Sequence, residues 1–185
     1  MFTWRDIHKK KKISPFYINN IINLLENEAL NKALKEKNIK LYFSLHHKMV
    51  EKYIYIFQKF NYIKFIEQNE ISNCLQKVNL IITDFSSIIF DIIYRKKPFI
   101  IYVPDANDTE IRGNYTKNYY ELFQYIKNGT FKLNNIYFDL NKTINKIFYY
   151  INNNFNLDPY LNKLYDRIGF KDDNNIEKFI QYLIN

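Results

Sequence analysis

Asn79-Leu-Ile-Ile-Thr-Asp-Phe-Ser-Ser-Ile-Ile-Phe-Asp91 is followed closely by Lys97-Pro98-Phe-Ile-Ile-Tyr-Val-Pro-Asp105. Residues 80–82 form a short continuous apolar run, which is typical of a strand in a parallel sheet covered on both faces. A second such run occupies residues 99–103, and a helix is predicted between the two at residues 87–94. The pattern therefore predicts a buried strand, a tight turn, a helix and a second buried strand.

Short polar side chains stand where the first strand gives way to the helix, namely Thr83, Asp84, Ser86 and Ser87. Serine is a preferred N-cap because its hydroxyl accepts a free backbone N–H of the first helical turn. The same N–H groups, at the positive end of the helix dipole, also form an anion site. We therefore predict a phosphate or diphosphate cradle at Ser86 and Ser87. The alternative is that both serines are ordinary helix caps and that Asp84 is a structural acceptor for loop N–H groups.

Strands and helices alternate on both sides of this unit. The predicted strands are residues 1–6, 41–45, 62–66, 80–83 and 99–103, and the predicted helices are residues 14–37, 48–59, 71–78, 87–94, 119–127, 141–152, 159–168 and 175–184. Residues 131–140 are ambiguous. Such alternation implies parallel βαβ units with right-handed crossovers. We expect an α/β fold, with a Rossmann-like parallel sheet and helices on both faces.

The first predicted helix starts at Ser14-Pro15, because Ser suits the N-cap and Pro the first helical position. Apolar residues follow at helical spacing and should pack on the sheet. These are Ile18, Ile22, Leu25 and Ala29. Asn38 is the predicted stop.

Composition favours one folded domain over residues 1–185, since aromatics make up 18% and hydrophobics 47% of the chain. The net charge of +8 favours anionic partners: phosphorylated ligands, anionic lipid surfaces or nucleic acid. Cys74 is the single cysteine, which fits a reducing compartment and excludes an intramolecular disulfide. The sequence has no secretory apolar segment and no apolar run of about 18 residues. We therefore expect a cytoplasmic location.

Four groups each follow the carboxyl end of a predicted strand: Arg5, His46, the Ser86–Ser87 pair and Arg112. In an open α/β sheet these ends lie at one edge, so the four groups can converge on one crevice. Each guanidinium could grip phosphate oxygens with two N–H groups. Taken singly, each residue has a structural or solvent-exposed role as its alternative.

Several common site motifs are absent from the sequence. It has no P-loop and no Gly-x-Gly-x-x-Gly, so the usual nucleotide-binding fingerprints are missing. It has no Cys-x-x-Cys and no His-Glu-x-x-His, so we expect no metal site and no cofactor. Neither a Gly-x-Ser-x-Gly elbow nor an RNA-binding aromatic motif is present, so nucleic acid is not an expected partner.

The central stretch closely resembles the "LITDYSSVxFD" signature of the CDP-glycerol glycerophosphotransferases, which build teichoic acid and related polymers. Other parts of the chain resemble the family's "KPIIFYxPD", "RGFY", "PTWR" and "LHP" segments, and a "DG" before its last helix. The matching residues are Leu80 to Asp91, Lys97 to Asp105, Arg112-Gly113-Asn-Tyr, Thr3-Trp4-Arg5, Leu45-His46 and Asp173-Asn174. Here Phe2 replaces the proline of "PTWR" and His47 replaces that of "LHP".

The resemblance implies a GT-B glycosyltransferase-like fold of two Rossmann-like halves, of which this chain looks like the C-terminal, donor-binding half. It implies that a CDP-alditol such as CDP-glycerol is the donor substrate and that CMP is released. It also implies that Arg5, His46, Thr83, Asp84, Ser86, Ser87, Arg112 and Gly113 form the donor site. Peripheral attachment to the inner face of the cell membrane is a further expectation from the family.

The family's acceptor half carries a His-Gly-Thr-Pro motif whose His is the expected general base, and no His here is followed by Gly. Transfer needs donor and acceptor held together with a base. We therefore expect no catalytic base in this chain and a separate N-terminal acceptor-domain polypeptide as partner. The alternative is a nucleotide-binding module without chemistry, or a truncated gene fragment.

Overall fold

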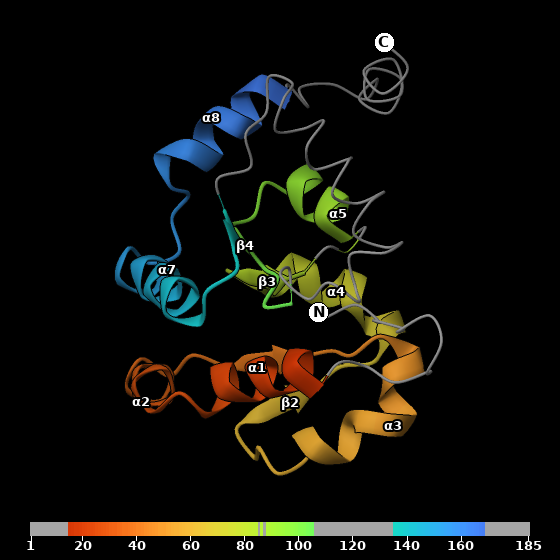
Figure 1. The fold of residues 1–185 in the computed structure, drawn as a ribbon. Coiled ribbons are helices and arrows are strands. Elements are labelled where there is room, and N and C mark those ends of the chain that lie inside the picture. The colour runs from red at the N-terminus through yellow and green to blue at the C-terminus, as the bar shows by residue number, and fades with distance from the viewer. Residues whose placement is uncertain (1–14, 85, 87, 106–134, 169–185) are drawn as a thin grey trace.

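The computed structural model describes residues 15–84, 86, 88–105 and 135–168 (Figure 1). The helices are α1 (Pro15–Glu26), α2 (Glu28–Glu36), α3 (His47–Phe57), α4 (Ile71–Lys77), α5 (Ile88–Tyr94), α7 (Leu140–Asn152) and α8 (Pro159–Ile168), with a 3₁₀ turn η1 (Gln68–Glu70). The strands are β1 (Leu41–Phe43), β2 (Ile63–Phe65), β3 (Ile81–Thr83), β4 (Phe99–Tyr102) and β5 (Ile136–Tyr137). In these parts of the chain every predicted strand is found, and so is every predicted helix apart from that at residues 14–37, which is divided in two; the ambiguous segment 131–140 contains β5.

The strands form two parallel sheets. β1 pairs with β2, and β3, β4 and β5 pair side by side in that order. Figure 1 shows α4 and α5 on one side of the three-stranded sheet and α7 and α8 on the other. The predicted fold class is confirmed: an α/β arrangement of parallel strands with helices on both faces, consistent with one Rossmann-like half.

One hydrophobic core joins the two sheets and the helices around them. Its centre is β4, where all four residues Phe99–Tyr102 are buried. Because both faces of this strand are covered, its apolar residues run continuously instead of alternating. The core fixes β3 and β4 relative to the helices, and so it fixes the loop that follows β3.

The first helix differs from the sequence prediction. Residues 14–37 were expected to form one helix, but it breaks at Asn27, whose backbone is extended and whose side chain accepts a hydrogen bond from the Leu30 N–H. Asn27 therefore caps a second helix, α2, that departs in a new direction. Ala29, expected on the buried face, is exposed for this reason, and Leu30 is buried instead. The predicted stop is confirmed, since Asn38 has a positive φ of 50° just after α2 ends.

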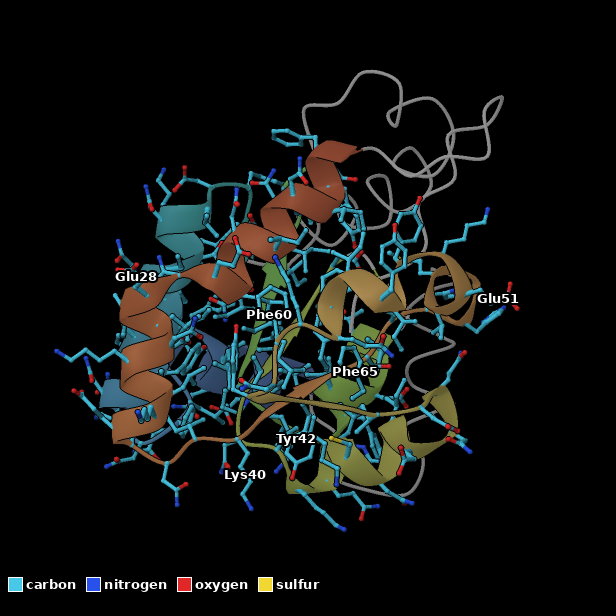
Figure 2. The ribbon with its side chains drawn as sticks, turned by 90° about the horizontal axis from the view of Figure 1, so that it is seen from below. Glu28, Lys40, Tyr42, Glu51, Phe60 and Phe65 are labelled. Atoms are coloured by element: carbon cyan, nitrogen blue, oxygen red, sulfur yellow. The ribbon has the colours of Figure 1, made fainter. Side chains whose placement is uncertain are left out.

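The two-stranded sheet buries one face and exposes the other. Phe43 and Ile63 face the core, whereas the register partners Tyr42 and Lys64 are exposed. Figure 2 labels Tyr42. The Lys64 ammonium lies 5.8 Å from the centre of the Tyr42 ring. Throughout the described parts of the chain, no helix has the length and apolar character needed to cross a bilayer.

Cys74 lies in α4 and is partly buried. Burial raises the pKa of its thiol, with a smaller contribution from Glu70. The thiol is therefore held in its protonated, less reactive form, which favours a packing role over chemistry.

Candidate functional site

The chain from β3 to α5 folds as a strand, a polar turn and a helix. Thr83 ends β3, and the Ser86 N–H donates to the Asp84 carbonyl at 2.8 Å, which closes a tight turn. The Ser86 hydroxyl accepts from the Ile88 N–H at 3.4 Å, and the Ser86 carbonyl accepts from the Ile89 N–H at 3.1 Å. Ser86 therefore caps the start of α5. Because α5 has only seven described residues, its dipole adds little, and recognition at this loop would depend on side chains.

Asp84 is held by a residue that sequence reasoning did not select. The Tyr17 hydroxyl on α1 donates to Asp84 Oδ2 at 2.8 Å, and both side chains are fully buried. Thr83 is also fully buried and Ser86 is nearly so. Asp84 thus ties the β3–α5 turn to α1, which agrees with a structural role for its carboxyl group.

α1 shows that both sheets present their carboxyl ends in the same direction. Near its start, Tyr17 contacts Asp84 after β3, and Asn20 accepts from the hydroxyl of Tyr102, the last residue of β4. At its end, the Leu25 carbonyl accepts from the Tyr62 hydroxyl, just before β2 begins. α1 therefore runs from the carboxyl ends of β3 and β4 to the amino end of β2.

His46 follows β1, which is parallel to β2. Because α1 shows that β2 points the same way as β3 and β4, the carboxyl end of β1 lies toward the same edge as those of β3 and β4. His46 therefore lies toward the same edge as Ser86, although 40 residues separate them in the chain. His46 is half-buried, and its carbonyl accepts from the Met49 N–H at 2.7 Å, which closes the first turn of α3. Its ring lies 4.2 Å from that of His47, and His47 Nδ1 lies 3.1 Å from Gln68 Oε1 on η1. Gln68 on η1 thus holds the His47 imidazole, and the His46 ring lies against that imidazole.

Tyr102 contributes a second hydroxyl to this edge. Burial, together with the nearby Asp139 and Asp105 carboxylates, raises the pKa of Tyr102 to about 12. The hydroxyl therefore remains protonated at neutral pH and donates to Asn20 Oδ1 at 3.5 Å. In contrast, the described residues contain no group of three or more His, Cys, Asp or Glu side chains that could hold a metal ion.

The remaining predicted site residues, Arg5, Ser87, Arg112 and Gly113, lie outside the described residues. The same is true of the predicted strand at residues 1–6 and the predicted helices at residues 119–127 and 175–184. Their part in the site stays a prediction.

Comparison with known proteins gives the chain its family. A sequence model described as CDP-glycerol:poly(glycerophosphate) glycerophosphotransferase matches residues 1–155, well over half of the 185 residues. The chain belongs to this glycerophosphotransferase family. No solved structure matches it significantly.

A curated relative is the minor teichoic acid biosynthesis protein GgaB of Bacillus subtilis (strain 168). It is 29% identical over 161 residues, which is 86% of this chain but 17% of the relative. The chain thus spans about a sixth of the length of that relative. The family match confirms the predicted family, that of the CDP-glycerol glycerophosphotransferases.

Sequence reasoning selected the polar residues after β1 and β3, and it missed the residues on α1 and β4 that form hydrogen bonds at the same edge. Tyr17 lies among the apolar residues of α1, and Tyr102 lies inside the apolar run of β4, so both read as core. Only the pairing of α1 with the carboxyl ends of β3 and β4 shows that their hydroxyls reach this edge.

Proposed function

We propose that this chain supplies the donor-binding half of a glycerophosphotransferase that moves glycerol phosphate, or a related alditol phosphate, from a CDP-linked donor to a cell-surface polymer and releases CMP. Family membership supports the kind of reaction. The observation that carries the donor-site assignment is the shared edge: His46 after β1 and the Ser86 turn after β3 lie toward the same ends of the parallel strands. Such edges are where open α/β sheets bind their ligands.

Roles follow from exposure and chemistry. His46 is the most accessible of the four described candidates and is suited to contact a phosphate oxygen. Ser86 is nearly buried and caps α5, while Thr83 and Asp84 hold the turn in place. We expect Ser87, Arg5 and Arg112-Gly113 to complete the diphosphate contacts, because hydroxyl and guanidinium groups donate hydrogen bonds to phosphate.

Isothermal titration of the chain with CDP-glycerol, CDP, UDP and GDP tests this proposal. We expect CDP-glycerol to bind more tightly than the other nucleotides, and His46→Ala to weaken its binding about tenfold, the value of one charge-assisted hydrogen bond. Lys142→Ala, which removes an exposed charge on α7, is the matched control and should leave binding unchanged. Equal binding of all nucleotides, with a steep salt dependence, would identify a general anion surface instead.

Transfer itself should need a second polypeptide. We propose that an acceptor domain bearing the His-Gly-Thr-Pro segment provides the general base, because donor and acceptor must be held in line with it. Mixing the chain with such a domain should start CMP release from CDP-glycerol. Turnover by the 185-residue chain alone would contradict this part of the proposal, and binding without turnover in any mixture would favour a non-catalytic nucleotide-binding module.

Attachment to an anionic membrane surface is the last part of the proposal. It is supported by the net charge of +8 and by the basic run at residues 9–12, because each Lys near an anionic bilayer contributes about 1 kcal/mol. Co-sedimentation with phosphatidylglycerol vesicles, but not with phosphatidylcholine vesicles, is the expected result.

A further inference from the structure

Ser44 has a hydroxyl that the fold does not satisfy. Its side chain is 4% exposed, and Oγ has no hydrogen-bond partner among the residues that the structure describes. A buried polar atom without a partner is unfavourable and rare in native proteins, so it requires an explanation. A polar group that binds at this point from outside the fold would provide one.

Ser44 lies at the edge that carries the candidate site. It follows Phe43, the last residue of β1, and precedes His46 by two positions. The chain is still paired at Leu45, which forms a β-bridge, so the backbone is extended through this segment. Alternate side chains of an extended chain point the same way, and Ser44 therefore shares its side of the chain with His46.

α3 begins three residues after Ser44. The helix has 11 residues, and its first turn, which starts at His47, contains no acidic side chain. Helix N-termini favour negative charge because their first N–H groups are unpaired and the dipole is positive there. Ser44, His46 and the start of α3 thus bring a neutral donor, an imidazole and backbone N–H groups together at one point.

We infer that Ser44, with His46 and the N-terminus of α3, binds one phosphoryl group of the nucleotide-linked donor. The inference rests on the proposed function and adds a second phosphate-binding point, on β1–α3, to that predicted on β3–α5. The Ser44 hydroxyl donates to a phosphate oxygen, and the helix N-terminus stabilises the charge on the same group. Two separate points, one on each sheet, suit a ligand with two linked phosphoryl groups.

Ser44→Ala tests this assignment because a serine that stabilises the fold and a serine that binds the ligand predict different results. Without a protein partner the hydroxyl contributes nothing to folding, so the variant should unfold at the same or a higher temperature than the wild type. Its affinity for CDP-glycerol and for CDP should fall about tenfold, as for the loss of one hydrogen bond to a charged group. Ser72→Ala is the matched control, since the Ser72 hydroxyl on α4 is exposed and already accepts from Arg95 Nη2.

Three further outcomes have distinct meanings. If the wild type binds CDP-glycerol and Ser44→Ala binds it equally well, the Ser44 assignment is wrong and the proposed function stands. If the variant unfolds at a lower temperature and keeps its affinity, the hydroxyl bonds to an internal water and the inference is again overturned. If the wild type does not bind CDP-glycerol, the proposed function fails, and an unchanged affinity of Ser44→Ala for inorganic pyrophosphate then overturns the phosphoryl site separately.

Discussion

The Tyr17 hydroxyl lies 2.8 Å from Asp84 Oδ2, although 67 residues separate the two in the chain. Both side chains are fully buried, so the hydrogen bond is shielded from water. It joins the first turn of α1 to the turn after β3, which is the centre of the family's signature segment. The position of the β3–α5 turn therefore depends on a residue outside that segment.

We predict that Tyr17→Phe destabilises the fold by about 1–3 kcal/mol, because it leaves a buried carboxyl oxygen short of a donor. It should also weaken CDP-glycerol binding, since the freed turn no longer holds Ser86 in place. Urea denaturation measures the first effect and isothermal titration the second.

Tyr165→Phe is the matched control for Tyr17→Phe. The Tyr165 hydroxyl donates to the Lys97 carbonyl, just before the amino end of β4 and away from the candidate site. This variant should lose stability and keep its affinity for CDP-glycerol. If Tyr17→Phe behaves in the same way, Tyr17 has a structural role only and does not position the site.

The sequence predicts the β3–α5 unit well because its evidence is local. Residues 80–94 contain three local signals. The apolar run at residues 80–82 favours a strand, the four short polar residues that follow it favour a helix cap, and the apolar residues after them favour a buried helix. The break at Asn27 is harder to predict because the apolar spacing continues past it. Asn27 is compatible with a helix interior, and its capping bond to Leu30 becomes decisive only once Leu30 packs in the core beside α1.

Long-range pairing cannot be predicted in this way. Tyr17 and Tyr102 read as core residues because their rings are apolar, and their hydroxyl partners, Asp84 and Asn20, come from distant parts of the chain. The same is true of Ser44, whose hydroxyl is buried without a hydrogen-bond partner among the described residues. A sequence shows which polar groups are present, but only packing shows which of them become buried together.

Two lysine–carboxylate pairs have the same N–O distance but differ in burial, so they show how burial affects the contribution of an ion pair to stability. Lys146 Nζ lies 2.6 Å from Asp158 Oδ2, and Lys59 Nζ lies 2.6 Å from Glu26 Oε1. The first pair is 17% and 5% exposed and the second 52% and 49%. Each ammonium also lies within 5 Å of a neighbouring aromatic ring. The two sites differ in their access to water, and Asp158 also accepts hydrogen bonds from the Tyr150 hydroxyl and the Leu161 N–H.

We predict that Lys146→Met destabilises the protein by about 3 kcal/mol, because it leaves the buried Asp158 carboxylate without its counter-charge. Lys59→Met should cost less than about 1 kcal/mol, as for exposed pairs. Chemical denaturation of both variants provides the comparison. Equal losses would show that burial does not determine the strength of these pairs.

The pH dependence of stability should report on Asp158. Burial alone raises the pKa of this carboxyl group, but hydrogen bonds from Lys146, the Leu161 N–H and Tyr150 outweigh burial and hold the pKa below its ordinary value. A carboxyl whose folded pKa is depressed stabilises the fold above its unfolded pKa of about 3.9, and this contribution is lost as the pH falls through the folded pKa.

We therefore expect Asp158→Asn to be less stable than the wild type by a constant amount above about pH 5, and the difference to shrink as the pH falls below about 4. Urea denaturation between pH 3 and pH 7 measures it. Glu36→Gln serves as the control, since Glu36 and its partner Lys32 are exposed and 3.9 Å apart, and it should change stability little at any pH. A difference that does not vary with pH would mean that the pKa of Asp158 is the same in the folded and the unfolded protein.

Asn27 provides a test of the helix break. Its side-chain oxygen accepts from the Leu30 N–H at 2.9 Å, so Asn27→Ala should cost about 1 kcal/mol through loss of the cap. Asn27→Asp should retain most of the stability, because a carboxylate also accepts this bond and favours the positive end of the α2 dipole. Asn23→Ala, at an exposed position within α1, should be neutral or slightly stabilising, because alanine has the higher helix propensity. If Asn27→Ala is as stable as the wild type, the break is imposed by packing of α2 and not by its cap.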